Sequence, residues 1–287
     1  KDIYKFDNIF FFQIFPPVEV LNKLKSKNLM WAPMYDSPHH PIGFSWILWK
    51  IVEHYRIKVL SFSKKINLKI SKYNIKYLDL KYFVKPSKNN KKISNKLDVF
   101  FWYRGDIDFD DWSNVLNKKD VRKIIYFDTQ SLNRKKLFSG NKKIQYIHKS
   151  FANKKDFVNL IKKSDIFVCP RLKEGIGMAN VESIALGKYL IANDEVTMSE
   201  YIINKKIGIF YNYSNTKKLD IKNVKNFKNY RYNYALNGFK TFEKNKKTII
   251  KLFKELKKNH HVYSAYYLLL FSVKMYTLKR KFLMFLR

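Results

Sequence analysis

Hydrophobic and polar positions along the chain follow two alternating patterns. Short apolar runs rich in β-branched and aromatic residues alternate with stretches in which apolar residues recur every three or four positions. The first pattern is typical of strands buried on both faces, and the second of helices that cover them. Their alternation predicts an α/β fold with parallel sheets and right-handed crossovers. The expected strands are 9–15, 28–34, 57–62, 76–84, 98–103, 123–127, 143–147, 166–169 and 189–192, and the expected helices are 17–24, 42–55, 154–163, 178–186 and 240–256.

A polar, basic and turn-rich segment at 85–97 separates two sets of these elements and is typical of a hinge. The chain has 287 residues with 46% hydrophobic content, enough to bury two ordinary cores. We therefore predict a partial amino-terminal domain at 1–90, a second domain at 91–258 and a basic amphipathic tail at 259–287.

A glycine loop joins the strand at 166–169 to the helix at 178–186. Gly175 and Gly177 allow the backbone to approach a ligand closely. The carboxyl ends of parallel strands, followed by a helix amino terminus, form a site for phosphate or another anion. The amides from Gly175 through Ile176 and Gly177 to Met178 are therefore candidates for binding such a group.

Two carboxylates, Glu174 and Glu182, frame that loop. Acidic side chains would repel an anion, so these two glutamates are not expected to bind the phosphate. A carboxylate accepts two hydrogen bonds from hydroxyl groups, and these are strong because the acceptor is charged. A nucleotide sugar offers both groups, a diphosphate for the amides and hydroxyls for the acids. The alternative is structural: Glu182 as a solvated helix residue and Glu174 as a capping acid.

The whole string resembles a known signature. It is similar, in order and spacing, to that of retaining glycosyltransferases of the GT-B fold, family four or group 1, in which a proline precedes Glu-Gly-Phe-Gly, then Glu-Ala and a Gly-x-Pro-Val strand. Ile176, Ser183 and Tyr189 depart from that signature at packing positions only. The resemblance is good over 98–212 and loose elsewhere; its matching positions are Pro170, Glu174, Gly175, Gly177, Glu182, Ala185, Gly187, Asp194 and Glu200.

This resemblance implies two Rossmann-like parallel-sheet domains that face a cleft. The amino-terminal domain is incomplete by that standard, because its usual glycine-rich loop is missing from the sequence. The implied activity is hexosyl transfer with retention, from a nucleotide sugar as co-substrate, without cofactor or metal. Glu174 would hold sugar hydroxyls and Glu182 the ribose. The implied acceptor is a glycan or lipid-linked molecule in bacterial cell-surface polysaccharide synthesis, such as that of lipopolysaccharide.

Three further residues are candidates for the donor site. Arg104 follows the strand at 98–103, where relatives carry an arginine that contacts the diphosphate; the alternative is an ion pair with Asp106 or Asp108. Arg171 is a candidate for a second phosphate contact, or else a solvated rim residue. Thr197 begins a helix near the expected cleft, where it binds the donor or caps the helix.

His39 lies in a proline-rich loop after the strand at 28–34, and some relatives use a histidine of this domain near the donor sugar. The alternative is that His39 and His40 are simply exposed. A metal site is not expected, because no third ligand has suitable spacing. The acids at 106–111 contain an Asp-x-Asp pattern, which we interpret as the entry to a helix.

The formal net charge of +35 arises from 58 Lys and Arg against 23 Asp and Glu. Such a charge favours nucleic acid or an anionic membrane as partner, although an AT-rich coding sequence also over-produces lysine. Basic residues spread along every predicted helix and most aromatic residues lie in strands, which argues against nucleic acid. The tail at 262–287 would lie on an anionic membrane or clasp the domains.

The single cysteine, Cys169, lies in an apolar strand and is expected to be a core residue. No run reaches the ~20 apolar residues of a spanning helix. We therefore expect a cytoplasmic enzyme, peripheral on the inner face of the membrane if the tail binds lipid. A degenerate scaffold that binds ligand without turnover remains an alternative, as does a basic nucleic-acid-binding protein, which ranks lower.

Overall fold

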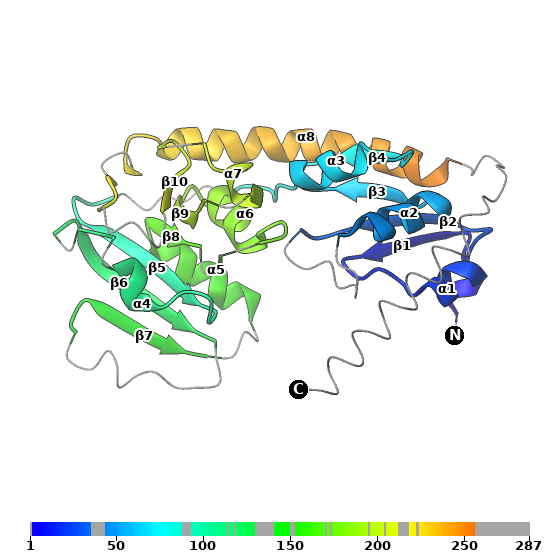
Figure 1. The fold of residues 1–287 in the computed structure, drawn as a ribbon. Coiled ribbons are helices and arrows are strands. Elements are labelled where there is room, and N and C mark those ends of the chain that lie inside the picture. Colours follow the sequence, from blue (N-terminus) through cyan, green and yellow to red (C-terminus); the bar gives the residue numbers. More distant parts are fainter. Residues whose placement is uncertain are drawn as a thin grey trace, which may run out of the picture. The chain divides into compact units, whose positions relative to one another are not determined.

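The computed structural model describes residues 2–35, 44–87, 93–113, 115–117, 119–129, 141–149, 153–169, 171–172, 174–194, 196–203, 205–211, 218–221 and 224–255. The chain forms two compact units, one made of Lys1–Lys81 with the chain from Glu243 onward, the other of Tyr82–Phe242. The first unit thus ends before the predicted boundary at residue 90. Each unit contains a parallel sheet (Figure 1), so the predicted α/β class is confirmed.

The first unit has a four-stranded sheet in the order β1-β2-β3-β4. Its core gathers around two indoles: Trp31 lies 5.9 Å from Trp49 and 4.8 Å from Phe15, between ring centroids. The sequence pattern predicted every strand of this unit but not its last helix, α3. The elements are η1 (Ile3–Lys5), β1 (Asn8–Phe12), α1 (Val18–Lys23), β2 (Asn28–Ala32), α2 (Trp46–His54), β3 (Lys58–Ser61), α3 (Lys64–Ile70) and β4 (Tyr77–Asp79).

The long helix α8 (Lys228–Lys254) contributes to both units, which divide at Phe242. In the first unit Lys58 holds the last turn of this helix. Lys58 is 5% exposed and its Nζ donates to the carbonyls of Phe253, at 3.3 Å, and of Glu255. Burial lowers the pKa of Lys58. Cations suit this position because a helix carboxyl terminus carries partial negative charge.

The second unit has a six-stranded parallel sheet in the order β10-β9-β8-β5-β6-β7. Its first strand in the chain, β5, lies between β6 and β8, so the direction of winding reverses there. That is the strand order of doubly wound dinucleotide-binding folds, whose ligands bind where the order reverses. The strands are β5 (Leu97–Tyr103), β6 (Val121–Asp128), β7 (Ile144–His148), β8 (Ile166–Val168), β9 (Tyr189–Asn193) and β10 (Gly208–Tyr211).

Helices pack on this sheet through aromatic residues. Phe157 of α5 lies 5.6 Å from Phe100 and 4.9 Å from Trp102, between ring centroids. Because every residue of β5 is buried, this strand forms the centre of the core. The helices of this unit, besides the first part of α8, are α4 (Phe109–Ser113), α5 (Lys154–Lys163), α6 (Met178–Ala185) and α7 (Val196–Ser199).

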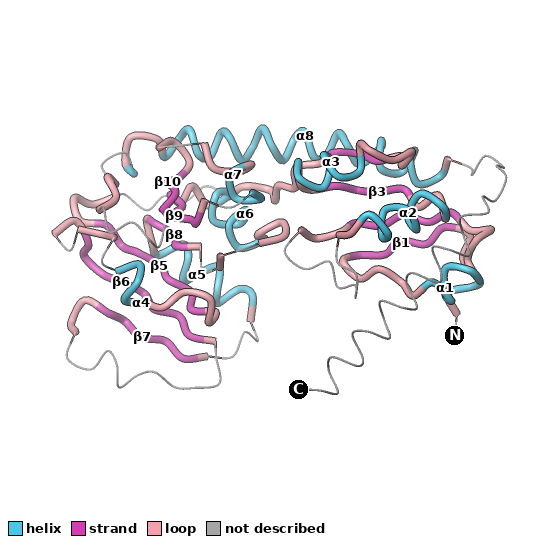
Figure 2. The backbone as a smooth tube through the Cα atoms, viewed as in Figure 1, coloured by secondary structure: helices cyan, strands magenta, loops and turns pink. Residues whose placement is uncertain are grey.

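Helices and strands alternate as predicted through most of both units, with β7 following β6 without a helix among the described residues between them (Figure 2). Helix α5 has the predicted bounds, while α8 begins at Lys228 rather than at residue 240, and β10 was not predicted. None of the helices in the described ranges combines the length and the apolar character that crossing a membrane requires.

Candidate functional site

The carboxyl ends of β5 and β8 lie side by side, because these strands are paired where the strand order reverses. Arg104 comes directly after β5, and the glycine loop comes directly after β8. The main predicted donor-site elements therefore share the edge of the sheet at which open α/β folds bind ligands.

Gly177 gives the loop its shape. It is the amino-terminal cap of α6 and has left-handed φ and ψ angles of 63° and 57°. A Cβ atom at this position would lie 2.5 Å from Cε of Met198 and 2.7 Å from Nδ2 of Asn180. No side chain fits there, so the loop backbone packs directly on these neighbours. The first two amides of α6, those of Met178 and Ala179, have no partner inside the helix and are suited to an anion, whereas the amide of Asn180 donates to the carbonyl of Gly177 at 2.8 Å.

Asn180 is a site residue that the sequence analysis missed. It is 1% exposed, and its Nδ2 donates to Sδ of Met198 at 2.7 Å. Its Oδ1 has no hydrogen-bond partner within the described chain. A buried polar atom left without a partner costs stability, so Asn180 holds the loop at some energetic expense. Its only sequence signal is a polar residue on the buried side of a short helix.

Three contacts tie the loop after β8 to its surroundings. The amide of Cys169 donates to the carbonyl of Ile191 at 2.8 Å, and Asn193 Nδ2 donates to the carbonyl of Leu172 at 3.3 Å. Nε of Arg171 lies 3.3 Å from Oδ2 of Asp106.

That last contact links the loop after β8 to the segment after β5. Arg171, predicted to contact phosphate, therefore pairs with a carboxylate of its own chain. The pair is about one-third exposed on both sides. Water screens a pair with this exposure, so a ligand anion can compete for the arginine.

Arg104 has a different environment. Its guanidinium carbon lies 4.5 Å from the centroid of the Trp102 ring, and Nε1 of Trp102 donates to Oγ1 of Thr129 at 3.1 Å. Neither Asp106 nor Asp108 pairs with it, and it forms no ion pair with any described residue. The ring supports the guanidinium plane, so the planar donor fork is available for an anion.

Glu182 projects from the second turn of α6 and is 13% exposed. Its Oε1 lies 2.7 Å from Nζ of Lys154, at the start of α5. The hydrogen bond and the charge of Glu182 raise the pKa of Lys154. Among the described residues, no group hydrogen-bonds Oε2. Glu182 is therefore not a fully solvated helix residue, and its second oxygen remains available to accept a ligand hydroxyl.

Glu174 is half-buried and lies close enough to Cys169 to affect its titration. Burial, and secondly the negative charge of Glu174, hold the pKa of the Cys169 thiol well above its usual range. Cys169 is buried, as predicted for a core residue. The two glutamates thus stand on either side of the buried segment Gly175–Gly177 in the chain.

The remaining candidates are placed only in part. Thr197 lies in α7, but its side chain is outside the described residues, and His39 is outside them entirely. Asp106 and Asp108 precede α4, as predicted for a helix entry. In the ranges that the structure describes, no three His, Cys, Asp or Glu side chains converge in a way that could hold a metal ion.

Comparison with known proteins agrees with this geometry. Residues 116–222 match the family model of glycosyl transferases group 1. The matched segment contains the glycine loop together with Glu174 and Glu182. The predicted resemblance is thus confirmed over this segment. Among curated proteins, no sequence matches the chain significantly.

Several solved structures share the fold. TarM of S. aureus is 15% identical with a TM-score of 0.57, and the match covers 83% of this chain and 53% of TarM. Pneumococcal GtfA in complex with UDP and GlcNAc is 11% identical with a TM-score of 0.60, over 82% of this chain and 55% of GtfA. HepE from Anabaena, in complex with UDP and glucose, is 12% identical with a TM-score of 0.60, over 88% of this chain and 79% of HepE.

These identities are low, so the comparison carries the fold alone. The predicted architecture of two parallel-sheet domains is confirmed, with a smaller sheet in the first unit. The chain spans little more than half the length of TarM and of GtfA.

Proposed function

We propose that this chain, whose residues 116–222 match group 1 glycosyl transferases, is a glycosyltransferase that takes its sugar from a nucleoside diphosphate donor. The observation that carries the proposal is the glycine-capped start of α6 where the strand order reverses, next to Arg104 and with a glutamate on either side. Main-chain amides, a helix amino terminus and a guanidinium favour a diphosphate. The carboxylates favour the hydroxyls of the same ligand.

In this proposal the two glutamates bind different parts of the donor. Oε2 of Glu182 accepts a hydroxyl of the ribose, while Lys154 holds Oε1 through its ion pair. Glu174 accepts hydroxyls of the transferred sugar. Neither acid acts as a nucleophile. Thr197, at the start of α7, and His39 are further candidates for donor contacts.

The proposed catalysis depends on the negative charge that develops on the leaving diphosphate. As the bond from sugar to diphosphate breaks, negative charge grows on the leaving phosphate, and Arg104 with the loop amides stabilises it. These groups supply positive charge where other transferases use a divalent cation, so we expect metal-independent transfer. We also expect retention, with attack on the same face and a leaving phosphate oxygen taking the acceptor proton.

The donor and acceptor classes are suggested by the relatives. GtfA and HepE were solved with UDP and a sugar, and S. aureus TarM with UDP and alpha-GlcNAc-glycerol. We therefore propose a UDP-hexose donor and a glycan or lipid-linked acceptor of cell-surface polysaccharide synthesis. An enzyme that acts on such an acceptor would work at the cytoplasmic face of a bacterial membrane.

Calorimetry with UDP, UDP-glucose and UDP-GlcNAc tests the donor site. We expect Glu182→Gln to weaken binding by roughly 10- to 100-fold, the value of a hydrogen bond to a charged group. Lys154 is 69% exposed, so it remains hydrated in this variant and the fold is kept. The matched control is Glu243→Gln, which removes a carboxylate 2.6 Å from Lys246 on α8. If no nucleotide sugar binds the wild-type protein, the proposal is wrong.

Binding without turnover is the second candidate, and the small first sheet favours it, with four strands against six. A donor-hydrolysis assay on the full chain separates the two cases. Release of free sugar from a bound UDP-hexose supports the enzyme, and tight binding with no release over long incubation supports the scaffold.

A further inference from the structure

The opposite edge of the six-stranded sheet is lined with cations. Because all six strands are parallel, their amino ends lie along one edge. A lysine lies within the three residues before the start of each strand, and further basic residues follow or flank them. The first set is Lys96, Lys119, Lys143, Lys163, Lys188 and Lys206, and the second is Arg122, Lys123, Lys142, Lys162 and Lys205.

Two buried cations fix the turns of this edge. Nζ of Lys188, which is 3% exposed, donates to the carbonyls of Lys162 at 2.8 Å and of Ser164 at 2.5 Å. Arg231 of α8 is fully buried and donates to the carbonyls of Gly187 at 2.8 Å and of Lys206 at 3.4 Å. Burial lowers the pKa of Arg231 to about 10, so it stays charged at neutral pH. The outer lysines therefore stand on a fixed scaffold.

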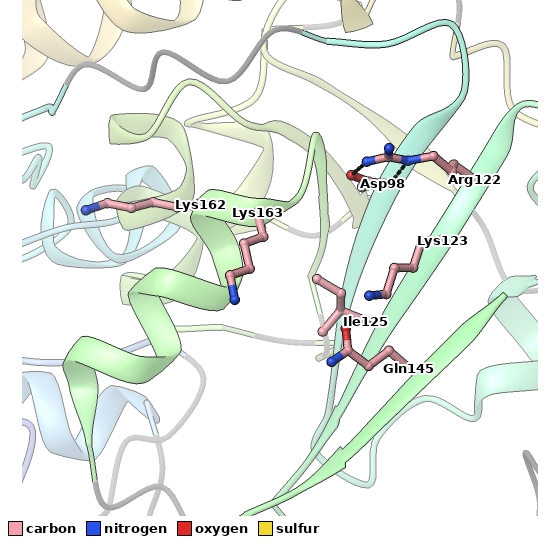
Figure 3. A pocket seen from close by; sticks show the side chains of 7 residues that line it. All are labelled: Asp98, Arg122, Lys123, Ile125, Gln145, Lys162 and Lys163. Carbon is pink, nitrogen blue, oxygen red and sulfur yellow. Dashed lines mark hydrogen bonds and ion pairs between the residues drawn. The ribbon is translucent and has the colours of Figure 1, made fainter. Parts of the chain in front are cut away.

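A cavity of about 510 Å³ opens on this edge between the starts of β5, β6 and β7 and the end of α5. Lys123 and Lys163 extend toward the open space, with Ile125 between them (Figure 3). Lys123 makes no ion pair within the described chain. The full lining is Asp98, Arg122, Lys123, Ile125, Gln145, Lys162 and Lys163.

The described acids of this edge are fewer than its cations. Asp98 accepts two hydrogen bonds from Arg122, at 2.8 and 2.5 Å, so its carboxylate is already paired. Asp165 is 3% exposed and accepts the amide of Asp98 at 2.8 Å. Asp120 alone is an exposed acid at the described strand starts. Positive charge thus dominates the surface around the cavity.

A purely local reading explains part of the pattern. Lys162 and Lys163 end α5, where cations complement the helix dipole. The helix dipole does not explain Lys96, Lys123 or Lys143, because these residues lie in or next to strands rather than at helix ends. A row of cations across neighbouring strands, with a cavity among them, therefore calls for an external anion.

We propose that this amino edge docks on an anionic phospholipid bilayer, with the cavity between β6 and α5 taking a phosphate headgroup. Six strands at about 4.8 Å spacing give a row roughly 24 Å wide, which suits an extended charged surface. Tyr230, whose ring centroid lies 5.2 Å from Nζ of Lys206, is an exposed aromatic near this edge. One ring already paired with a lysine is not the row of stacking aromatics that single-stranded nucleic acids use. This surface lies at the opposite edge of the sheet from the candidate donor site.

Flotation of the full chain with phosphatidylglycerol or phosphatidylcholine vesicles tests the proposal. Each charge reversal, Lys123→Glu or Lys163→Glu, is expected to weaken binding to phosphatidylglycerol vesicles by about tenfold or less. Together they are expected to lower partitioning by about 30-fold or more. The wild type is expected to ignore phosphatidylcholine. Both side chains are exposed, and unchanged UDP binding verifies that the double variant folds.

The matched control makes the same charge change elsewhere, with Lys155→Glu and Lys240→Glu, both exposed. Lys155 lies about 12 Å along α5 from Lys163 by the helical rise, beyond the Debye length at 0.1 M salt. We expect this control to float almost like the wild type. Equal flotation of the two double variants, or none of the wild type, overturns the proposal.

Two soluble competitors identify the source of the anion. Glycerol phosphate is expected to compete poorly, because a bilayer presents many phosphates to the whole row of lysines. If glycerol phosphate displaces vesicles readily, the cavity is a site for free phosphate and the bilayer proposal is wrong. A single-stranded RNA that binds more tightly than vesicles, and depends on Lys123 and Lys163, likewise contradicts it.

Discussion

The two edges of the six-stranded sheet differ in charge and in construction. Among the residues that the structure describes, acids outnumber bases at the carboxyl edge, whereas a lysine precedes every strand at the amino edge. The net charge of +35 therefore does not describe the carboxyl edge of this sheet. The donor-site candidates lie on the less basic edge, and the excess positive charge concerns a different surface. The polar residues of the carboxyl edge include Arg104, Asp106, Asp108, Asp128, Arg171, Glu174 and Asp194.

The construction of the edges differs as well. The carboxyl edge holds a left-handed glycine with no room for a Cβ and a buried asparagine oxygen without a described partner. Such local costs are typical of functional sites. At the amino edge, Lys188 and Arg231 saturate the buried carbonyls. We expect the first edge to depend on exact backbone geometry and the second on summed charge.

The largest effect is expected from Gly177→Ala. The new methyl group meets Met198 Cε and Asn180 Nδ2 at 2.5 and 2.7 Å, in a left-handed backbone. The loop must move, so we expect UDP affinity to fall at least 100-fold and the free energy of unfolding by about 1–3 kcal/mol. Calorimetry and denaturant unfolding measure the two.

Gly187 provides the matched control at the other end of α6. Its φ of 70° is equally left-handed, but a Cβ there has no neighbour closer than 3.9 Å. Gly187→Ala should therefore lose similar stability from backbone strain while keeping UDP affinity. A comparable loss of affinity in both variants would mean that backbone strain alone, rather than the shape of the glycine loop, controls UDP binding.

The next effect separates the edges. We expect the Lys123→Glu and Lys163→Glu double variant to lose vesicle binding by about 30-fold while its UDP affinity stays within twofold of wild type. Gly177→Ala should show the reverse, weak UDP binding with normal flotation. Raising salt should abolish flotation before it weakens UDP binding, because exposed charges are screened first. Coupled losses in both variants would contradict two independent surfaces.

Two arginines sharpen the picture within the carboxyl edge. Arg104 rests on Trp102 without an ion pair in the described chain, whereas Arg171 already pairs with Asp106. We expect Arg104→Ala to weaken UDP binding by roughly 10- to 100-fold. Arg171→Ala should cost roughly threefold, since a partly exposed pair contributes little. Calorimetry on both variants measures the difference, and a larger effect at Arg171 would reassign the phosphate contact to the loop after β8.

Sequence pattern predicted the strand, glycine loop and helix of the site because these signals are local. Apolar spacing marks β8 and α6, and the glycines mark the turn between them. The start of α8 was missed because tertiary contacts stabilise it: Arg231 is fully buried there, although arginine is usually exposed. The Lys154 partner of Glu182 was missed for the same reason, since the two residues meet only after α5 and α6 pack together.

The smallest effect concerns Cys169, which follows β8 directly and precedes the glycine loop in the chain. Its thiol pKa is raised, by burial first and Glu174 second, so folding favours the protonated form. The resulting stabilisation is complete below the unfolded-state pKa of about 8.5 and is lost as pH rises above it. We expect unfolding free energy to fall from pH 8.5 upward, a slope that Cys169→Ala should lack.

Alkylation by iodoacetamide reports the same thiol directly. At pH 9 the native protein should react far more slowly than the unfolded chain, because a buried thiol presents little thiolate. Glu174→Gln removes the secondary cause and should speed the reaction a few-fold, while the amino-edge double variant should leave it unchanged. Rapid alkylation of the native protein would show that Cys169 is open to solvent. It would also weaken the case that the glycine loop is preformed at this edge.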